Sequence, residues 1–171
     1  DGGETEFLLD NRHLYLRTGR MTKMLKIRST VFGAVHSYFR DRDFIEYQAP
    51  NFVAGAVEGG STLFEVPYFG KKAYLTQSWQ LYAESAIFSL EKIYNHGPTF
   101  RAEKSKTSRH LSEFWMAEME AAWFDLDDVT EFAKKEIKYC IQEVLEKHED
   151  DLKFLGSDVS KLKQVVKKKW P

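Results

Sequence analysis

The chain has 171 residues, of which 43% are hydrophobic and 15% aromatic; this composition predicts one globular domain with a core and excludes a disordered chain. Its 25 basic and 26 acidic residues give a net charge of −1, so any RNA contact has to come from local patches rather than from a basic domain. The single cysteine, Cys140, excludes an internal disulfide and a cysteine-based zinc cluster, and no apolar run predicts a membrane span. A cytoplasmic protein with no membrane partner fits these features, as do many other classes.

The chain starts with a stretch that resembles a linker, followed by a long helix. Residues 1–10 are acidic and rich in glycine. Apolar residues at a spacing near 3.6 predict a helix over residues 21–42, and Thr18 or Thr22 could cap its start. Residues 44–47 then alternate in polarity like a strand that ends at Pro50.

The middle of the chain predicts a glycine-rich loop, two short strands and a helix. Glu58 lies among glycines in residues 51–62, in a loop flexible enough to close over a ligand, although a single loop glutamate is more often simply exposed. Strands are predicted over residues 63–66 and 73–76. Gln80, in a helix predicted to run from residue 77 to 90, offers both a donor and an acceptor for an ammonium or carboxylate group.

A hairpin with cations at its base and tip is the organising feature of the chain. Apolar residues 93–100 and the returning residues 113–120 predict two antiparallel strands, joined by a polar loop that carries Arg109 and His110. Arg101, at the base, can bind phosphate in a bidentate fork, and an aromatic ring on the return strand offers a stacking face. The acidic residues that could receive an amine or amide N–H are Glu103, Glu118 and Glu120. The pattern indicates a nucleotide site beside a site for a small amino-bearing ligand, but a merely solvated basic tip explains the charges equally well.

The last third of the chain is predicted to be helical. From Asp125 onward one apolar stripe predicts a core-facing helix, formed by Val129, Phe132, Ala133, Ile137, Cys140, Ile141, Val144 and Leu145. The charged run of residues 146–151 could hold a metal, but a solvated surface explains it sufficiently. A terminal amphipathic segment, residues 159–170, carries five lysines and is interpreted as a solvated helix face rather than an RNA contact.

Four stretches together resemble one family. They are EGGSTLFEV (58–66), YFGKKAYLTQS (68–78), QLYAE (80–84) and GPTFRAEKSKTSRHLSEFW (97–115). They resemble the asparaginyl members of the class II aminoacyl-tRNA synthetases, and FRAE…RHLSEF is similar to motif 2 of that class. The resemblance, over about residues 10–128, implies an α+β fold in which helices flank an antiparallel sheet.

The resemblance also implies the domain organisation. Residues 1–19 would be the linker or hinge from an anticodon-binding domain that is absent here, and residues 20–171 the first part of the catalytic domain. The helix, strand and Pro50 of residues 21–50 resemble motif 1 and imply a homodimer, whereas periodicity alone favours an ordinary helix covering a sheet. Motif 3, which carries an arginine for the γ-phosphate of ATP, is not found after Lys147. We therefore expect this chain alone to be inactive.

By resemblance, the function is ATP-dependent activation of asparagine to asparaginyl-adenylate and its transfer to tRNA(Asn) in translation. Arg101 would be the catalytic residue, holding the α-phosphate and the substrate carboxylate, and Phe114 would stack on adenine. Magnesium is expected to bridge the phosphates, with no protein ligand assigned. The ATP-binding residues would be Arg101, Ala102, Glu103, Arg109, His110, Leu111 and Phe114, and the amino-acid-binding residues Glu58, Gln80 and Glu118.

Three positions bear on specificity or depart from the family pattern. Ala83 stands where the aspartyl enzymes have a lysine that pairs with the substrate carboxylate, which favours a neutral amide side chain. Trp79 replaces a small residue or proline, and we expect its ring to crowd the pocket. Met119 replaces the proline of the usual E-P-E segment.

Two other functions remain open from the sequence. A synthetase-like asparagine synthetase would keep the fold and form the amide from aspartate without tRNA. A non-catalytic dimerising or regulatory module would account for the missing motif 3, although the intact Arg101, Glu103, His110 and Phe114 argue against a loss of binding.

Overall fold

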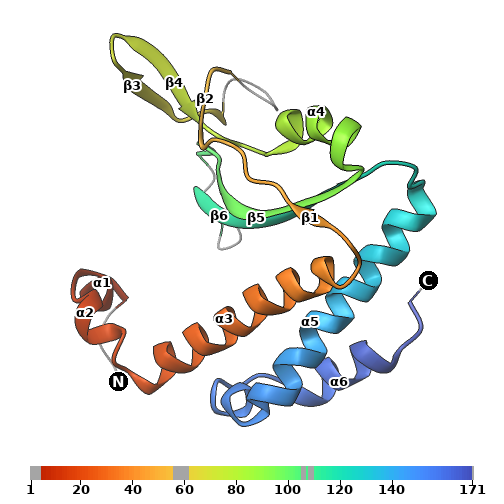
Figure 1. Cartoon of the computed structure of the whole chain (residues 1–171). Helices are drawn as coiled ribbons and strands as arrows, with labels where there is room; N and C mark the ends of the chain where they lie inside the picture. The colour runs from red at the N-terminus through yellow and green to blue at the C-terminus, as the bar shows by residue number, and fades with distance from the viewer. Residues whose placement is uncertain (1–4, 56–61, 105–106, 108–109, 171) are drawn as a thin grey trace. The chain divides into compact units, whose positions relative to one another are not determined.

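The computed structural model describes residues 5–55, 62–104, 107 and 110–170 (Figure 1). It divides into two compact units, a helical one formed by Asp1–Tyr38 and Leu126–Pro171, and a sheet-containing one formed by Phe39–Asp125. In the described part of the chain, no helix has the length and apolar character needed to cross a membrane.

The helical unit begins with two short helices, α1 (Thr5–Asp10) and α2 (Arg12–Tyr15), in the stretch predicted to be a linker. The long helix α3 (Gly19–Arg40) follows and confirms the predicted helix, with its start two residues earlier. Thr18 is its cap, because the Met21 backbone N–H donates to Thr18 Oγ1 at 3.3 Å. The hinge role of residues 1–19 stays a prediction.

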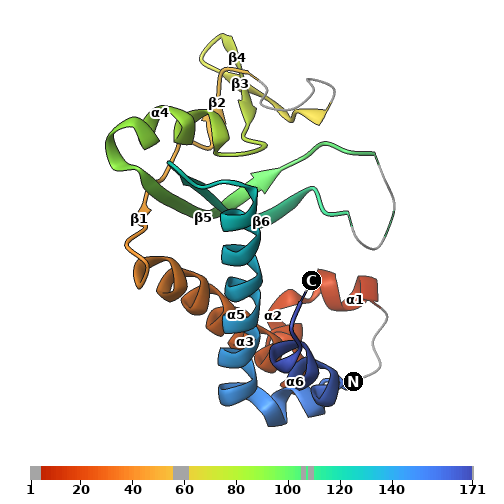
Figure 2. The same cartoon turned by 90° about the vertical axis from the view of Figure 1, so that its right-hand side faces the viewer.

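Two further helices, α5 (Leu126–Phe154) and α6 (Val159–Lys167), lie side by side in both views (Figures 1 and 2). The predicted apolar stripe of α5 is confirmed only in part: Phe132 and Val144 are buried, whereas Val129 and Ile137 are 40% and 46% exposed. Tyr38 packs edge-on against Phe132 with ring centroids 5.0 Å apart, and its hydroxyl donates to the Phe132 carbonyl at 3.2 Å. Phe132 and Val144 therefore belong to the core of the helical unit.

An apolar groove of about 410 Å³ runs between the helices of this unit. Glu136 is the single carboxylate that lines it, and burial there raises the pKa of Glu136 to about 7. Burial also raises the pKa of Cys140 to about 11. The remaining lining residues are Ile27, Val31, Ala133, Ile137, Ile141, Val144 and Leu162.

Glu136→Gln should stabilise the protein at pH 8 by about 1–2 kcal/mol, an amount discounted for partial solvent access. The ordinary carboxyl pKa of 4.5 is raised in the folded state, so the folded state holds the proton longer and loses stability as the pH rises from 4.5 to about 7. The gain should therefore vanish near pH 4. Urea unfolding at both pH values measures it, with Glu146→Gln, at an exposed position of the same helix, as control. An equal gain at pH 4 and pH 8 would contradict the assignment.

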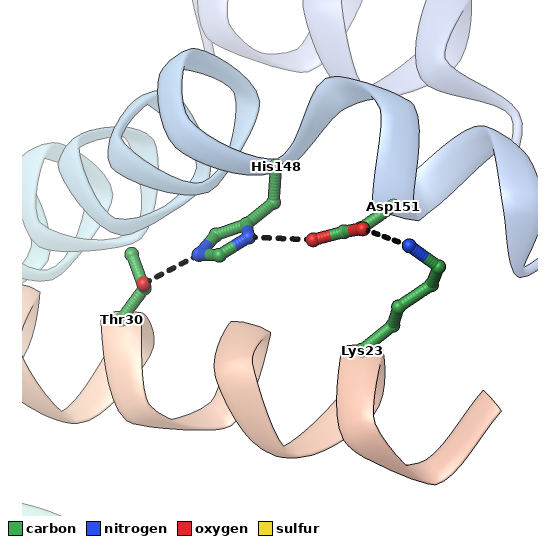
Figure 3. Close-up of polar contacts among 4 residues, drawn as sticks. All are labelled: Lys23, Thr30, His148 and Asp151. Atoms are coloured by element: carbon green, nitrogen blue, oxygen red, sulfur yellow. Dashed lines mark hydrogen bonds and ion pairs between the residues drawn. The ribbon is translucent and has the colours of Figure 1, made fainter. Parts of the chain in front are cut away.

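A polar network joins α5 to α3 near a kink in α5 at His148, where φ is −138° and ψ is 26° (Figure 3). The His148 ring contacts Thr30 Oγ1 through Nε2 at 2.7 Å and Asp151 Oδ2 through Nδ1 at 3.0 Å. Lys23 Nζ donates to Asp151 Oδ1 at 2.6 Å. The hydrogen bonds from Lys23 and then His148 lower the pKa of Asp151. Part of the acidic run interpreted as solvated surface is thus a structural contact between two helices.

The sheet-containing unit has two three-stranded sheets. In the first, β1 (Ile45–Glu46) lies parallel to β5 (Lys92–Phe100), which pairs antiparallel with β6 (Glu113–Ala121). The predicted hairpin is confirmed. In the second sheet, β4 (Lys71–Leu75) lies between β2 (Phe52–Val53) and β3 (Glu65–Tyr68), and both pairings are antiparallel.

The two faces of the β5–β6 hairpin have different environments. On one face, α4 (Gln80–Leu90) packs through Ala83 against Ile93, with Trp79 completing the buried cluster. On the other face, Tyr94 stacks on Phe39 with ring centroids 4.6 Å apart and an interplanar angle of 2°. Because side chains alternate along a strand and paired residues share a face, the α4 side also carries Asn95, Gly97, Thr99, Phe114, Met116 and Glu118.

Candidate functional site

A pocket of about 360 Å³ opens at the loop end of the β5–β6 hairpin. The end of β5 and the start of β6 lie next to each other there, because Thr99 pairs with Phe114. Its lining residues are all among those predicted to bind ATP: Arg101, Glu103, His110, Leu111 and Phe114. The structure therefore brings together these five residues of the predicted nucleotide site. Ala102 is described but is not among the lining residues, and Arg109 lies outside the described residues.

Arg101 and Phe114 combine a cation with an aromatic face. The guanidinium carbon of Arg101 lies 5.7 Å from the centroid of the Phe114 ring, a distance at which the two attract. The Arg101 backbone N–H donates to the Ser112 carbonyl at 3.0 Å, and Ala102 N–H donates to the Thr62 carbonyl at 2.7 Å. These bonds fix the strand end, so the guanidinium is presented from a well-anchored backbone.

His110 and Glu103 form the polar side of the same pocket. His110 Nε2 lies 3.9 Å from Glu103 Oε2, close enough for an ion pair when the ring is protonated. The other ring nitrogen, Nδ1, is hydrogen-bonded to the hydroxyl of Thr107. Both side chains are exposed, so they remain available to a ligand.

Glu118 on β6 holds the start of α4. Its carboxylate accepts from the Ser78 hydroxyl at 2.6 Å and from the Trp79 backbone N–H at 3.3 Å. Ser78 Oγ in turn accepts from the Gln80 backbone N–H at 3.1 Å. A carboxylate at a helix N-terminus satisfies free N–H groups and interacts favourably with the helix dipole. Glu118 thereby sets the position of Gln80, the other described residue predicted to read the amino acid.

Carboxylates surround the exposed Gln80 side chain. Gln80 Nε2 donates to Glu84 Oε1 at 2.9 Å. The pKa of Glu120 is raised first by burial and then by the nearby charges of Glu84 and Glu118. This accumulation of negative charge favours a ligand that presents N–H groups or a positive charge. Glu58, the third residue predicted to bind the amino acid, lies outside the described residues.

The expectation that Trp79 crowds the pocket is wrong. Its ring is only 3% exposed and lies in the core cluster, where the indole N–H donates to the Tyr47 carbonyl at 2.7 Å. Ala83, completely buried, belongs to the same cluster. Met119 pairs with Tyr94 and so lies on the face opposite Glu118. The bulk of Trp79 stabilises the α4–β5 contact, because an indole that finds a hydrogen-bond acceptor can be buried.

Sequence reasoning missed two residues that support the site. Ser78 links Glu118 to α4. The Thr62 carbonyl accepts from the Ala102 backbone N–H, and the Thr62 hydroxyl accepts from the Gln77 side-chain amide at 2.6 Å. A serine at the opening of a predicted helix is a capping signal and could have indicated Ser78. No local pattern indicates the role of Thr62.

Comparisons with known proteins agree along almost the whole chain. The family model described as class II tRNA synthetases (D, K and N) matches residues 4–170. The asparagine–tRNA ligase of Thermoplasma acidophilum is 50% identical over 165 residues, which cover 96% of this chain and 38% of that protein. The asparagine–tRNA ligase of Desulforamulus reducens is 46% identical over 94% of this chain and 37% of its own length.

Solved structures share the fold. The asparaginyl-tRNA synthetase from Pyrococcus horikoshii, complexed with asparaginyl-adenylate, matches with a TM-score of 0.91 and 44% identity over 95% of this chain and 38% of that one. A putative aspartyl-tRNA synthetase from Leishmania major matches with a TM-score of 0.80 and 28% identity, over 91% and 30% of the two chains. The predicted α+β fold with antiparallel sheets is confirmed, and the chain spans 38% of the first of these structures.

Proposed function

Because this chain belongs to the class II tRNA synthetases of the aspartate, lysine and asparagine group, we propose that it carries part of the active site of an asparagine–tRNA ligase. The reaction is ATP-dependent formation of asparaginyl-adenylate, followed by transfer of the asparaginyl group to tRNA(Asn). The observation that carries the proposal is the pocket in which a guanidinium, Arg101, lies over an aromatic ring, Phe114, beside His110 and Glu103. This combination suits a nucleotide, which is an anion joined to a flat base.

In the first step an oxygen of the asparagine carboxylate attacks the α-phosphorus of ATP, and pyrophosphate leaves. Both reactants are anionic, so the site has to neutralise charge and align the attack. Arg101 would hold the α-phosphate and the carboxylate together, and Phe114 would stack on adenine. Arg109 and His110 would reach the outer phosphates. The remaining residues of the nucleotide site would be Ala102, Glu103 and Leu111. In the second step a ribose hydroxyl of the tRNA attacks the acyl carbon, and AMP leaves. The substrates supply every reacting group, so no nucleophilic side chain is required.

The amino acid would be read by Glu58, Gln80 and Glu118. Glu118 keeps lone pairs beyond its bonds to Ser78 and Trp79, and these can accept from the carboxamide of asparagine. The buried Ala83 provides no cation for a substrate carboxylate. An acceptor at Glu118 and an uncharged residue at position 83 favour asparagine over aspartate.

Magnesium would enter with ATP and bridge its phosphate oxygens, neutralising charge on them. Within residues 5–55, 62–104, 107 and 110–170, no group of three or more His, Cys, Asp or Glu side chains could hold a metal ion. Among the described residues that line the pocket, Glu103 is the carboxylate that could contact such an ion.

We further propose a homodimer that forms through α3 and β1, the elements that correspond to motif 1. Large apolar side chains on these elements are well exposed, namely Met24 at 43%, Leu25 at 44% and Ile45 at 47%. Covering such residues with a second copy removes apolar surface from water. We place the activity in the cytoplasm, where tRNA(Asn) would be the partner.

The test is asparagine-dependent ATP–pyrophosphate exchange by the protein expressed from its complete gene, with aspartate and lysine as controls. Exchange with asparagine alone is the expected result, and exchange with aspartate instead would overturn the specificity. Ammonia-dependent formation of asparagine from aspartate, without exchange on asparagine, would favour an asparagine synthetase. No activity in any of these assays would favour a non-catalytic module.

A further inference from the structure

Asn95 lies on β5 directly opposite Glu118 on β6. The β5–β6 register pairs the two residues, so both side chains project from the face that α4 covers. Ile93, two residues earlier on β5, is in the buried cluster with Trp79. Thr99, four residues later, pairs with Phe114 of the nucleotide pocket. Asn95 therefore lies between the apolar core and the nucleotide pocket.

The Asn95 side chain leans along β5 over Gly97. A Cβ atom placed on Gly97 would lie 3.1 Å from both Oδ1 and Nδ2 of Asn95, closer than ordinary van der Waals contact. The missing side chain of Gly97 thus makes room for the amide. The amide is directed from the core towards the nucleotide end of the strand.

Asn95 is buried, with 7% of its surface exposed, and its Oδ1 atom has no hydrogen-bond partner within the described residues. A buried acceptor left without a donor destabilises the folded state. Ser78, which bonds the paired residue Glu118, does not supply a donor, because its hydroxyl donates to Glu118. An N–H group of a bound ligand would satisfy the Asn95 oxygen.

We propose that Asn95 is a specificity-determining residue for the amino acid: its Oδ1 accepts one N–H of the substrate carboxamide, and Glu118 accepts the other. This proposal rests on the asparagine-activating function proposed above. Acceptors that flank one NH₂ group lie about 5 Å apart, for bonds near 2.9 Å at 120°. Opposite residues of an antiparallel pair have Cβ atoms about 4.5–5.5 Å apart, so both side chains begin within reach of one NH₂ group. Aspartate presents only acceptor oxygens at the same place, so it would be repelled by the Glu118 carboxylate.

The first experiment compares Asn95→Ala and Asn95→Leu with the parent protein, expressed from the complete gene, in ATP–pyrophosphate exchange. The KM for asparagine should rise about tenfold in both variants, while the KM for ATP stays unchanged. The melting temperature should stay equal or rise, because no internal hydrogen bond is lost and a buried polar group is removed. Ser89→Ala, at an exposed polar residue of α4, is the control and should change neither quantity.

The second experiment uses N4-methylasparagine, in which a methyl group replaces one carboxamide hydrogen. The parent protein should have a much higher KM for N4-methylasparagine than for asparagine. In Asn95→Ala the ratio of these two KM values should be about tenfold smaller, because the methyl group fills the space left by the Asn95 side chain. An unchanged KM for asparagine in both variants, or an unchanged ratio, would overturn the proposal. A fall in melting temperature with equal rises in both KM values would make Asn95 a structural residue instead. A parent protein that shows no exchange with asparagine would overturn the proposed function itself, which is a separate outcome.

Discussion

Arg101→Ala is expected to lower the kcat of asparagine-dependent ATP–pyrophosphate exchange about a hundred- to a thousandfold. The guanidinium lies at the mouth of the nucleotide pocket over Phe114, where charge develops as carboxylate and α-phosphate approach. Arg101→Lys should recover little of the loss, because an ammonium on a flexible stem cannot form the two parallel hydrogen bonds of a guanidinium. The measurement is exchange at saturating ATP and asparagine with the protein from the complete gene.

Two controls show whether the loss of activity arises from the site itself rather than from unfolding. Arg12→Ala, at an exposed arginine of α2, should leave kcat unchanged. The melting temperature of Arg101→Ala should stay near that of the parent, since the backbone bonds of Arg101 and Ala102 to Ser112 and Thr62 remain. A loss of activity smaller than fivefold would show that Arg101 does not take part in the reaction.

Glu118→Ala is expected to lower the free energy of unfolding by about 2–3 kcal/mol, because it leaves a buried hydroxyl and a helix-terminal N–H without their acceptor. The carboxylate receives both the Ser78 hydroxyl at 2.6 Å and the Trp79 N–H, and it sets the start of α4. Glu118→Gln should cost about 1 kcal/mol, since one side-chain oxygen still accepts. Chemical denaturation measures both differences.

The same pair of variants tests substrate specificity. The amide of Glu118→Gln presents donors where the substrate carboxamide needs an acceptor, so the ratio of asparagine-dependent to aspartate-dependent exchange should fall by at least about tenfold. Glu113→Gln, at an exposed glutamate of the same strand, is the matched control. If the ratio stayed constant while stability fell, Glu118 would be a helix cap alone.

The nucleotide pocket was accessible to sequence reasoning because its residues are close together in the chain. Arg101, Glu103, His110, Leu111 and Phe114 lie within one hairpin. Alternating strands separated by a polar loop predict such a hairpin, and strand pairing then has to bring the residues at its loop end together. The periodic stripe of α5 was predictable for the same reason, since it depends on spacing within one helix.

The remaining features depend on contacts between residues far apart in the chain. The spacing of residues within one segment does not predict such contacts. Ser78 meets Glu118 across 40 positions, and Lys23 meets Asp151 across 128. The direction of the Trp79 ring, towards the core rather than the pocket, depends on the space left between α4 and β5. The sequence alone determined the hairpin, its pocket and the family resemblance. Only the tertiary structure decided what holds α4 in place and where the unsatisfied amide of Asn95 lies, because burial and hydrogen-bond partners exist only once the elements have packed.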